Sequence, residues 1–179
     1  MKLDEKGFTL IELVVVGGTM ALIMGAASLV LFHVVSDTQR TSDHITTVHQ
    51  TENAGYWISR DTQMAEGITA EGLSAPEFLV LRWTDWGYGE DTIYHVVSYS
   101  IEDLSDGIGD LKRTHQDSSG ANEERIVAEN IYYNPSDPEN TTQVSYENEI
   151  LNLRVVTIFG ESQESKEYQT CRRPDLVSP

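Results

Sequence analysis

Two residues near the N-terminus, a glycine and a glutamate, are unusual for their surroundings and are candidates for a cleavage site and an ionic contact. Gly7 closes a short charged leader, and Glu12 is a single carboxylate inside an apolar run. A carboxylate at the centre of a bilayer costs about 2.5–3.5 kcal/mol, so Glu12 calls for a partner. If the chain is cut between Gly7 and Phe8, the new α-amine lies one helical turn before Glu12. In a helical assembly we therefore expect Glu12 of one subunit to pair with that amine on a neighbour.

The apolar run is long enough to cross a membrane. Residues 8–35 carry no charge except Glu12, and as a helix they would span about 42 Å, against about 30 Å of hydrocarbon. A cleaved signal peptide has a shorter apolar core of roughly 7–15 residues, so a retained anchor is favoured. Lys2 and Lys6 precede the run and the next basic residue is Arg40. The positive-inside rule then places the rest of the chain outside the cytoplasm.

The start of the chain resembles the type IV pilin and pseudopilin superfamily. The match is Lys6-Gly7 followed by the sequence FTLIELVVV over residues 8–16. The resemblance implies cleavage after Gly7 by a prepilin peptidase, N-methylation of the exposed Phe8, and a role for Glu12 in methylation and subunit docking. The chain departs from many major pilins in one respect, because its first proline is Pro76 and none lies in the apolar span.

The helix is predicted to continue beyond the apolar run. Residues 36–64 contain no proline and a single glycine, and Ile45 and Val48 share one face. Toward the end, side chains recur at intervals of three and four, which is the pattern of a helix that packs on a sheet. They are Ala54, Trp57, Ile58, Asp61, Met64, Ala65 and Ile68. We therefore expect one helix over residues 8–65, ended by Gly67, Gly72 and Pro76.

Asp61 is unusual on this stripe, because an unpaired buried charge is costly. We expect it to cap backbone amides or to meet a basic group. The segment around Arg60-Asp61, residues 57–65, is similar to the helix end of J-type minor pseudopilins. A tyrosine-bearing strand followed by a Leu-x-Arg strand also recurs in those proteins, and Tyr99 and residues 111–113 resemble that pair.

The remaining sequence predicts an antiparallel sheet. Alternating or apolar runs predict the strands 78–83, 92–101, 111–115, 126–133, 150–159 and 166–171. Turns or loops are expected at 85–91, 103–110, 116–124 and 134–140. The predicted fold class is α+β and pilin-like, with the long N-terminal helix packed on the sheet. The predicted division is a leader (1–7), an apolar half-helix (8–35), an amphipathic half-helix (36–66) and a β-rich domain (67–179).

Composition limits the chemistry further. The formal net charge is −17, from 29 acidic and 12 basic residues, which argues against a general nucleic-acid surface. Cys171 is the single cysteine, so no intrachain disulfide can form, and we expect it to be buried or unreactive. The five histidines show no metal-binding spacing, and no nucleophile or phosphate-loop motif is present. We therefore expect no enzymatic activity and no thiolate metal site.

Three smaller features remain candidates for binding. Asp103, Asp106 and Asp110 place hard oxygen ligands in one glycine-containing loop, which makes the loop a candidate calcium site although its spacing is not that of an EF-hand. Residues 140–142 form a glycosylation sequon. The aromatic residues Trp83, Trp86 and Tyr88 lie at a predicted hairpin end, where Trp83 is expected in the core and the other two either there or at a subunit contact.

The expected function is structural. The resemblance implies a subunit anchored in the cytoplasmic (inner) membrane, processed by prepilin peptidase and assembled with minor tip subunits and a major subunit into an extracytoplasmic filament. Within the superfamily, a J-like minor subunit of a type II secretion pseudopilus or related machine is favoured. A minor pilin for adhesion or DNA uptake and a membrane-tethered enzyme are the alternatives. Exposed aromatic residues or a local basic patch would favour the first, and a deep pocket with converging polar groups would favour the second.

Overall fold

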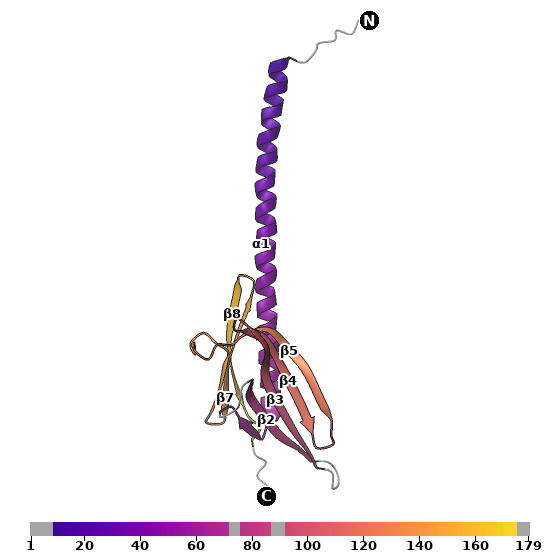
Figure 1. Ribbon diagram of the computed structural model, residues 1–179, viewed down its shortest axis with the longest axis vertical. Coiled ribbons are helices and arrows are strands. Elements are labelled where there is room, and N and C mark those ends of the chain that lie inside the picture. The colour runs from indigo at the N-terminus through magenta and orange to yellow at the C-terminus, as the bar shows by residue number, and fades with distance from the viewer. Residues whose placement is uncertain (1–8, 72–75, 87–91, 175–179) are drawn as a thin grey trace. The chain divides into compact units, whose positions relative to one another are not determined.

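The structure is a computed structural model that describes residues 9–71, 76–86 and 92–174. These residues form one helix and eight strands (Figure 1). The elements are α1 (Leu10–Met64), β1 (Gly67–Thr69), β2 (Glu77–Trp86), β3 (Thr92–Ser105), β4 (Ile108–Asp117), β5 (Asn122–Tyr132), β6 (Gln143–Glu147), β7 (Ile150–Phe159) and β8 (Ser162–Cys171). The α+β class is confirmed, and the predicted helix agrees with α1 to within two residues at either end.

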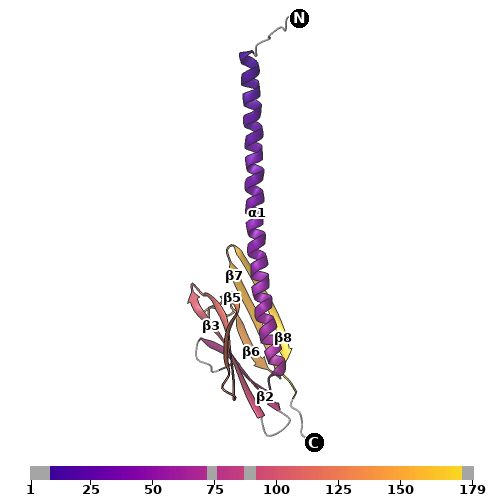
Figure 2. The ribbon, with the colours of Figure 1, turned by 90° about the vertical axis from the view of Figure 1, so that its right-hand side faces the viewer.

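All strand pairs in the sheet are antiparallel. The strand order is β1-β2-β3-β4-β5-β7-β6, and β8 pairs with β7 along its other edge. Ile131 of β5 and Thr157 of β7 form the single register pair that joins the first five strands to the last three. The sheet therefore curls as two groups of strands, as the two ribbon views show (Figure 2).

The chain divides within α1 into two compact units, Met1–Ser42 and Asp43–Pro179. In the first unit no described residue is buried. In the second, one side of α1 packs on the sheet, and its buried residues are Thr47, Thr51, Ala54, Gly55, Ile58, Asp61 and Thr62. The two parts of one helix thus differ in what they bury within the chain.

The core of the second unit lies between α1 and the sheet. Ala54, Ile58 and Ala65 come from the helical stripe predicted above, and Trp57, Met64 and Ile68 pack against the same cluster. The strands contribute buried side chains that include Leu79, Leu81, Val97, Tyr99, Leu111, Ile131, Leu151 and Val155.

The prediction of which side of α1 is buried is wrong near residue 45. Ile45 is 50% exposed, whereas Thr47 and Thr51 are fully buried. The Thr51 hydroxyl lies 2.7 Å from that of Thr157, and the Thr157 hydroxyl donates to the Thr47 carbonyl at 3.0 Å. The helix approaches β7 through hydrogen-bonding threonines here, so hydrophobicity alone predicted the wrong side.

The loop predicted at 116–124 is a tight hairpin turn instead. β4 continues to Asp117 and β5 begins at Asn122. The Asp117 carboxylate accepts hydrogen bonds from the Ser119 hydroxyl and from the Ser119 and Ala121 amides. These bonds close the turn in four residues, and they hold the pKa of Asp117 below its usual value.

The predicted loop 103–110 also shrinks to a two-residue turn. Asp106 and Gly107 have φ values of 52° and 82°, as in the type I′ turns that suit tight hairpins. β3 and β4 pair on either side of the turn, up to Ser105 and Ile108. Strands β1 and β6 were not predicted, and β1 contains Gly67 and Ile68, which were expected at the helix end and on the helical stripe. β8 begins four residues earlier than expected.

Cys171 and the aromatic residues give mixed outcomes. Cys171 is exposed, which contradicts burial, the first of the two expected alternatives, and leaves the second, an unreactive thiol, as a prediction. Trp83 is 7% exposed and belongs to the core, as predicted. The predicted turn at 85–91 begins inside β2, which runs to Trp86, and Tyr88 lies outside the described residues.

Asn140 of the predicted glycosylation sequon is exposed, and its side-chain amide donates to the Asp137 carboxylate.

Candidate functional site

The start of α1 is built by Thr9 and Glu12. One oxygen of the Glu12 carboxylate accepts hydrogen bonds from the Thr9 backbone amide at 3.0 Å and the Thr9 hydroxyl at 2.8 Å. The Glu12 amide lies 3.4 Å from the Thr9 hydroxyl in return. This reciprocal arrangement is a capping box, which satisfies backbone donors that a helix start leaves unpaired.

Glu12 therefore has a partner within its own chain. Glu12 was predicted to act in assembly, and this local role was not predicted, although the Thr-x-x-Glu spacing signals it. Both accepted bonds use the same oxygen, Oε2. The predicted cleavage and methylation residues, Gly7 and Phe8, lie outside the described residues, so the geometry of an amine pair with Glu12 stays a prediction.

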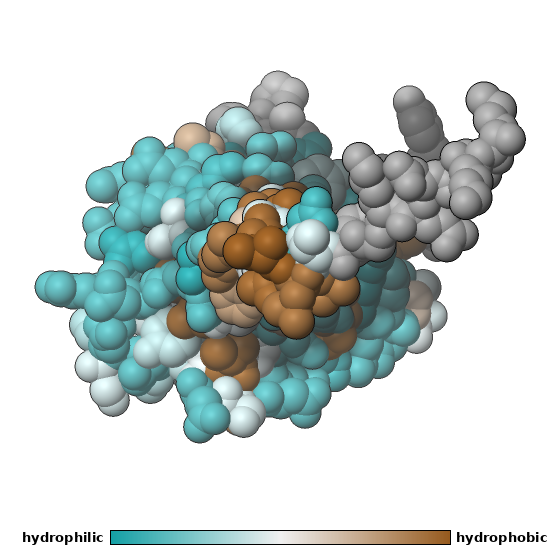
Figure 3. Space-filling view, turned by 90° about the horizontal axis from the view of Figure 1, so that it is seen from above, coloured by the Kyte–Doolittle hydropathy of each residue, from teal (hydrophilic) through white to brown (hydrophobic). Residues whose placement is uncertain are grey.

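The helix of the first unit presents apolar side chains on all sides. Leu10 is 84% exposed and Phe32 71% exposed. The helix near the N-terminus is long and apolar enough to cross a membrane. Its side chains appear as a hydrophobic patch in Figure 3, and most of the remaining visible surface is hydrophilic. Within the described chain nothing buries this surface.

The second unit holds α1 through a buried ionic contact at Asp61. The Asp61 carboxylate is fully buried and accepts a hydrogen bond of 2.6 Å from Nε of Arg113 on β4. A second guanidinium nitrogen of Arg113 donates at 3.3 Å, and the Tyr99 hydroxyl on β3 donates at 2.6 Å. The expectation that Asp61 meets a basic group is confirmed, with Arg113 in that position. The contact joins the helix to two neighbouring strands.

The electrostatics of this contact keep each partner in its hydrogen-bonding form. Burial would lower the pKa of Arg113, but the hydrogen bonds and charge of Asp61 raise it above its usual value. Burial also raises the pKa of Tyr99 well above its usual range, and the negative charge of Asp61 adds to the effect. Arg113 stays charged and Tyr99 stays a donor, so the Asp61 carboxylate keeps its partners.

A second contact lies one to two turns earlier, where α1 meets β8. Gly55 is buried against the Tyr168 ring, and a Cβ at that position would overlap the ring carbons. The Tyr168 hydroxyl donates to the Thr51 carbonyl at 3.1 Å. Burial and the nearby carboxylates of Glu52 and Glu164 raise the pKa of Tyr168 to about 12, so the hydroxyl remains a donor. This close approach requires a residue without a side chain.

Two histidines that looked unrelated in the sequence meet across the β3–β4 hairpin. His95 Nδ1 lies 3.0 Å from His115 Nε2, and both rings stack with Trp83. His95 Nε2 lies 3.2 Å from an Asp85 oxygen. Their spacing in the sequence gave no sign of this contact, because it depends on the β3–β4 register, which pairs His95 with Asp117 and His115 with Val97 and so makes the histidines diagonal neighbours.

The candidate calcium ligands do not form a binding cluster. Asp103 lies in β3, Asp106 in the hairpin turn and Asp110 in β4. In the described part of the chain, no group of three or more histidine, cysteine, aspartate or glutamate side chains is placed to hold a metal ion. The two-residue turn accounts for this, since it distributes the three carboxylates over both strands and the turn instead of one open loop.

No protein-family model, curated protein or solved structure matches this chain. The long N-terminal apolar helix followed by a helix-on-sheet domain is consistent with a pilin-like fold. The fold class is therefore established from the chain's own structure.

Proposed function

We propose that the protein is a structural subunit of the type IV pilin and pseudopilin kind, assembled as a minor subunit into a filament or pseudopilus. The observation that carries the proposal is the wholly exposed apolar part of α1, headed by the FTLIELVVV sequence of residues 8–16. Its continuation in the same helix is fixed to a sheet through Asp61. One part of this helix is thus joined to a folded domain, and the other part has an apolar surface that lipid or other subunits must cover.

In this proposal the protein performs no catalysis itself. Prepilin peptidase cuts after Gly7 and methylates Phe8, and residues 8–35 hold the precursor in the cytoplasmic membrane with the second unit outside. After processing, the same residues pack among other pilin-type subunits. The Arg60-Asp61 segment and the absence of a second cysteine favour a J-like minor subunit whose partners are other minor tip subunits.

The capping box allows a test that separates charge from helix capping at Glu12. Gly7→Ala should leave an unprocessed precursor in the membrane. Glu12→Ala should be cleaved but assemble poorly, because it removes both the cap and the charge. Glu12→Gln keeps a side chain that can cap the helix but has no charge, so it should still assemble poorly if the charge is what assembly requires. Processing is read on immunoblots of membrane fractions and assembly in sheared-filament fractions.

Normal assembly of Glu12→Gln would show that Glu12 acts only as a cap, and it would refute the pairing with a neighbouring amine. Normal processing of Gly7→Ala would contradict the proposed pathway as a whole.

A further inference from the structure

The outer edge of β5 is open along most of its length. On one side β5 pairs with β4 from Asn122 to Tyr132, but on the other side only Ile131 pairs, with Thr157. The register with β4 shifts twice, around Leu111, and Asn130 has a positive φ of 60°. Such bulges bend a strand, and the bend accounts for the early separation of β5 from β7. An open edge of this kind offers unpaired backbone donors and acceptors.

The register shows which backbone groups face outward. The Asp117 amide donates to the Ala121 carbonyl, so these two residues form a hydrogen-bonded pair at the start of the hairpin. Hydrogen-bonded and non-hydrogen-bonded pairs alternate along antiparallel strands. The backbone groups of Asn122, Glu124 and Ile126 therefore point away from β4. Further along, the Glu129 amide donates to the Gln50 side chain of α1 at 2.9 Å.

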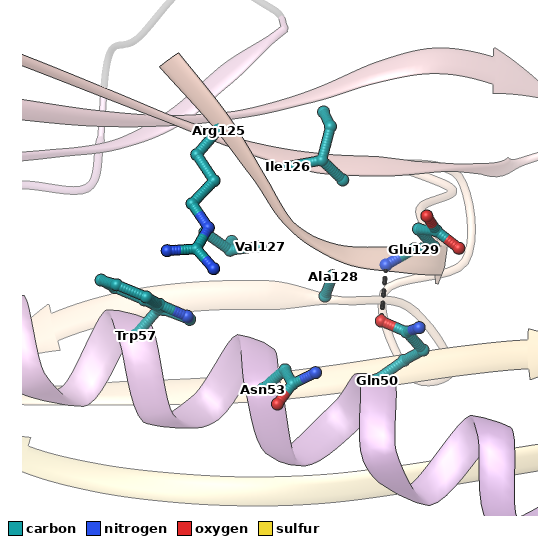
Figure 4. Close-up of a pocket in the computed structure, with 8 residues that line it drawn as sticks. All are labelled: Gln50, Asn53, Trp57, Arg125, Ile126, Val127, Ala128 and Glu129. Atoms are coloured by element: carbon teal, nitrogen blue, oxygen red, sulfur yellow. Dashed lines mark hydrogen bonds between the residues drawn. The ribbon is translucent and has the colours of Figure 1, made fainter. Parts of the chain in front are cut away.

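This edge forms one wall of a groove, and α1 forms the other. The groove has a volume of about 290 Å³ and is lined by Gln50, Asn53 and Trp57 from α1 and by residues 125–129 of β5. Figure 4 shows the Arg125 side chain directed toward Trp57 at one end and the Gln50–Glu129 hydrogen bond at the other. Of the residues with outward backbone groups, Ile126 lines this groove, together with the polar side chains of Gln50, Asn53 and Arg125.

The Trp57 end of the groove is positively charged. The guanidinium carbons of Arg60, Arg113 and Arg125 lie 5.2, 5.4 and 5.1 Å from the centre of the Trp57 ring. Asp61 neutralises Arg113. Within the described ranges Arg60 and Arg125 make no ion pair or hydrogen bond, and both are exposed. Two unpaired arginines are unexpected on a protein with a net charge of −17.

We propose that this groove binds an extended acidic segment of a partner polypeptide, which pairs with the outer edge of β5 and places a carboxylate against Arg125. The open edge supplies the main-chain hydrogen bonds of strand addition. The guanidinium group of Arg125 supplies a charge-assisted contact that selects an acidic residue. Arg60 adds positive charge at the same end.

The features of the groove favour a polypeptide over a nucleic acid. A nucleic acid needs many cationic contacts along its phosphates, whereas the described groove lining contains a single arginine together with Glu129. A strand edge, in contrast, matches the regular spacing of amides and carbonyls in an extended peptide. This site is independent of membrane anchoring and filament assembly, so its test can fail without affecting the proposed function.

The probe is a random decapeptide library displayed on phage, selected on the full-length protein in lipid nanodiscs. We expect the recovered peptides to be enriched in Asp and Glu next to β-branched residues. Fluorescence anisotropy then gives their dissociation constants. Arg125→Glu should weaken binding by about tenfold or more, because it replaces an attractive charge by a repulsive one. Arg82→Glu is the matched control, since exposed Arg82 lies on β2 and is separated from β5 by β3 and β4.

A second pair of variants tests the strand edge. Ile126→Pro removes the outward amide of a half-exposed residue, whereas Ile126→Ala keeps it. We expect only the proline variant to lose binding, and in the wild type the amides of Glu124 and Ile126 should gain protection from hydrogen exchange when peptide binds. If the proline variant fails to fold, the arginine variants and the exchange data still decide the proposal.

Three results would overturn the proposal. One is that no peptide is recovered or that the recovered peptides show no acidic enrichment. Another is equal binding to Arg125→Glu and to the wild type. The third is unchanged hydrogen exchange along β5 on peptide binding, which would exclude strand addition.

Discussion

The two parts of α1 belong to one continuous helix but differ in what surrounds them. In the first unit the side chains are mainly apolar and none of those described is buried. In the second unit the helix is more polar, yet it buries Asp61 and three threonines, Thr47, Thr51 and Thr62. Hydrophobicity therefore does not predict which part packs within the chain. The apolar part has a surface for other molecules, and the polar part is held by specific hydrogen bonds.

Among single substitutions in α1, the change at Asp61 should destabilise the second unit most. Asp61→Ala should lower the free energy of unfolding by about 3–5 kcal/mol, because it leaves Arg113 buried without its counter-ion. The matched control is Asp37→Ala, at an exposed aspartate of the first unit, which should change stability by less than about 0.5 kcal/mol. Urea unfolding of the full-length protein in detergent, followed by tryptophan fluorescence, measures both.

Replacing both Asp61 and Arg113 shows whether the loss of stability comes from the unpaired buried charge. Asp61→Leu with Arg113→Met removes the pair without leaving a buried charge, so it should recover much of the lost stability. A loss of less than about 1 kcal/mol for Asp61→Ala would contradict the account, since that is the size of an exposed ion pair.

Glycine substitutions should give the next largest difference between the two parts. Gly55→Ala places a methyl group against the Tyr168 ring and should cost about 1–3 kcal/mol through overpacking. At Gly25 an added Cβ meets nothing within 4 Å. Gly25→Ala should therefore not destabilise the chain and should favour its helix by up to about 1 kcal/mol. Thermal unfolding by circular dichroism compares the two variants, and equal effects would contradict the difference in packing.

The smallest expected effect is a pH dependence confined to the second unit. Burial, with Arg113 and His95 nearby, lowers the pKa of His115 below 6.5, while Asp117 and Asp61 oppose the shift. Well above pH 6.5 the ring is neutral in both the folded and the unfolded state. As the pH falls below that value, the unfolded state binds the proton first, so the stability of the second unit should decrease.

His115→Gln should flatten this part of the stability profile, measured by urea unfolding between pH 5 and 7.5 at about half-unit steps. A variant that keeps the full slope would show that other groups cause it.

The sequence predicted the elements whose signals are local. The apolar run and the stripe around Ile58 predicted α1, and the period-two pattern predicted β7 over its full length. The sequence did not predict elements whose structure depends on pairing with a neighbouring strand. β6 and β8 are mostly polar, and they are extended because both pair with β7. The turn between β6 and β7, Asn148-Glu149, has positive φ at both residues without a glycine to signal it.

The candidate sites also divide into those with a local sequence signal and those that depend on distant residues. Thr9 and Glu12 are three residues apart, so their capping box could have been predicted from spacing. Asp61 was recognised as unusual, but its partner Arg113 is 52 residues away and depends on the register of β4. The groove at β5 could not be predicted, because it depends on where one strand separates from the next.

Mass spectrometry of the N-terminus of the protein, purified from its native membrane, shows where the chain is cut. We expect a mature chain that begins at Phe8, with or without one added methyl group. Such a chain would place the exposed apolar part of α1 in the pilin pathway. An intact Met1, or a cut after the apolar run, would contradict the account and leave an ordinary anchor or signal peptide attached to the helix-on-sheet domain.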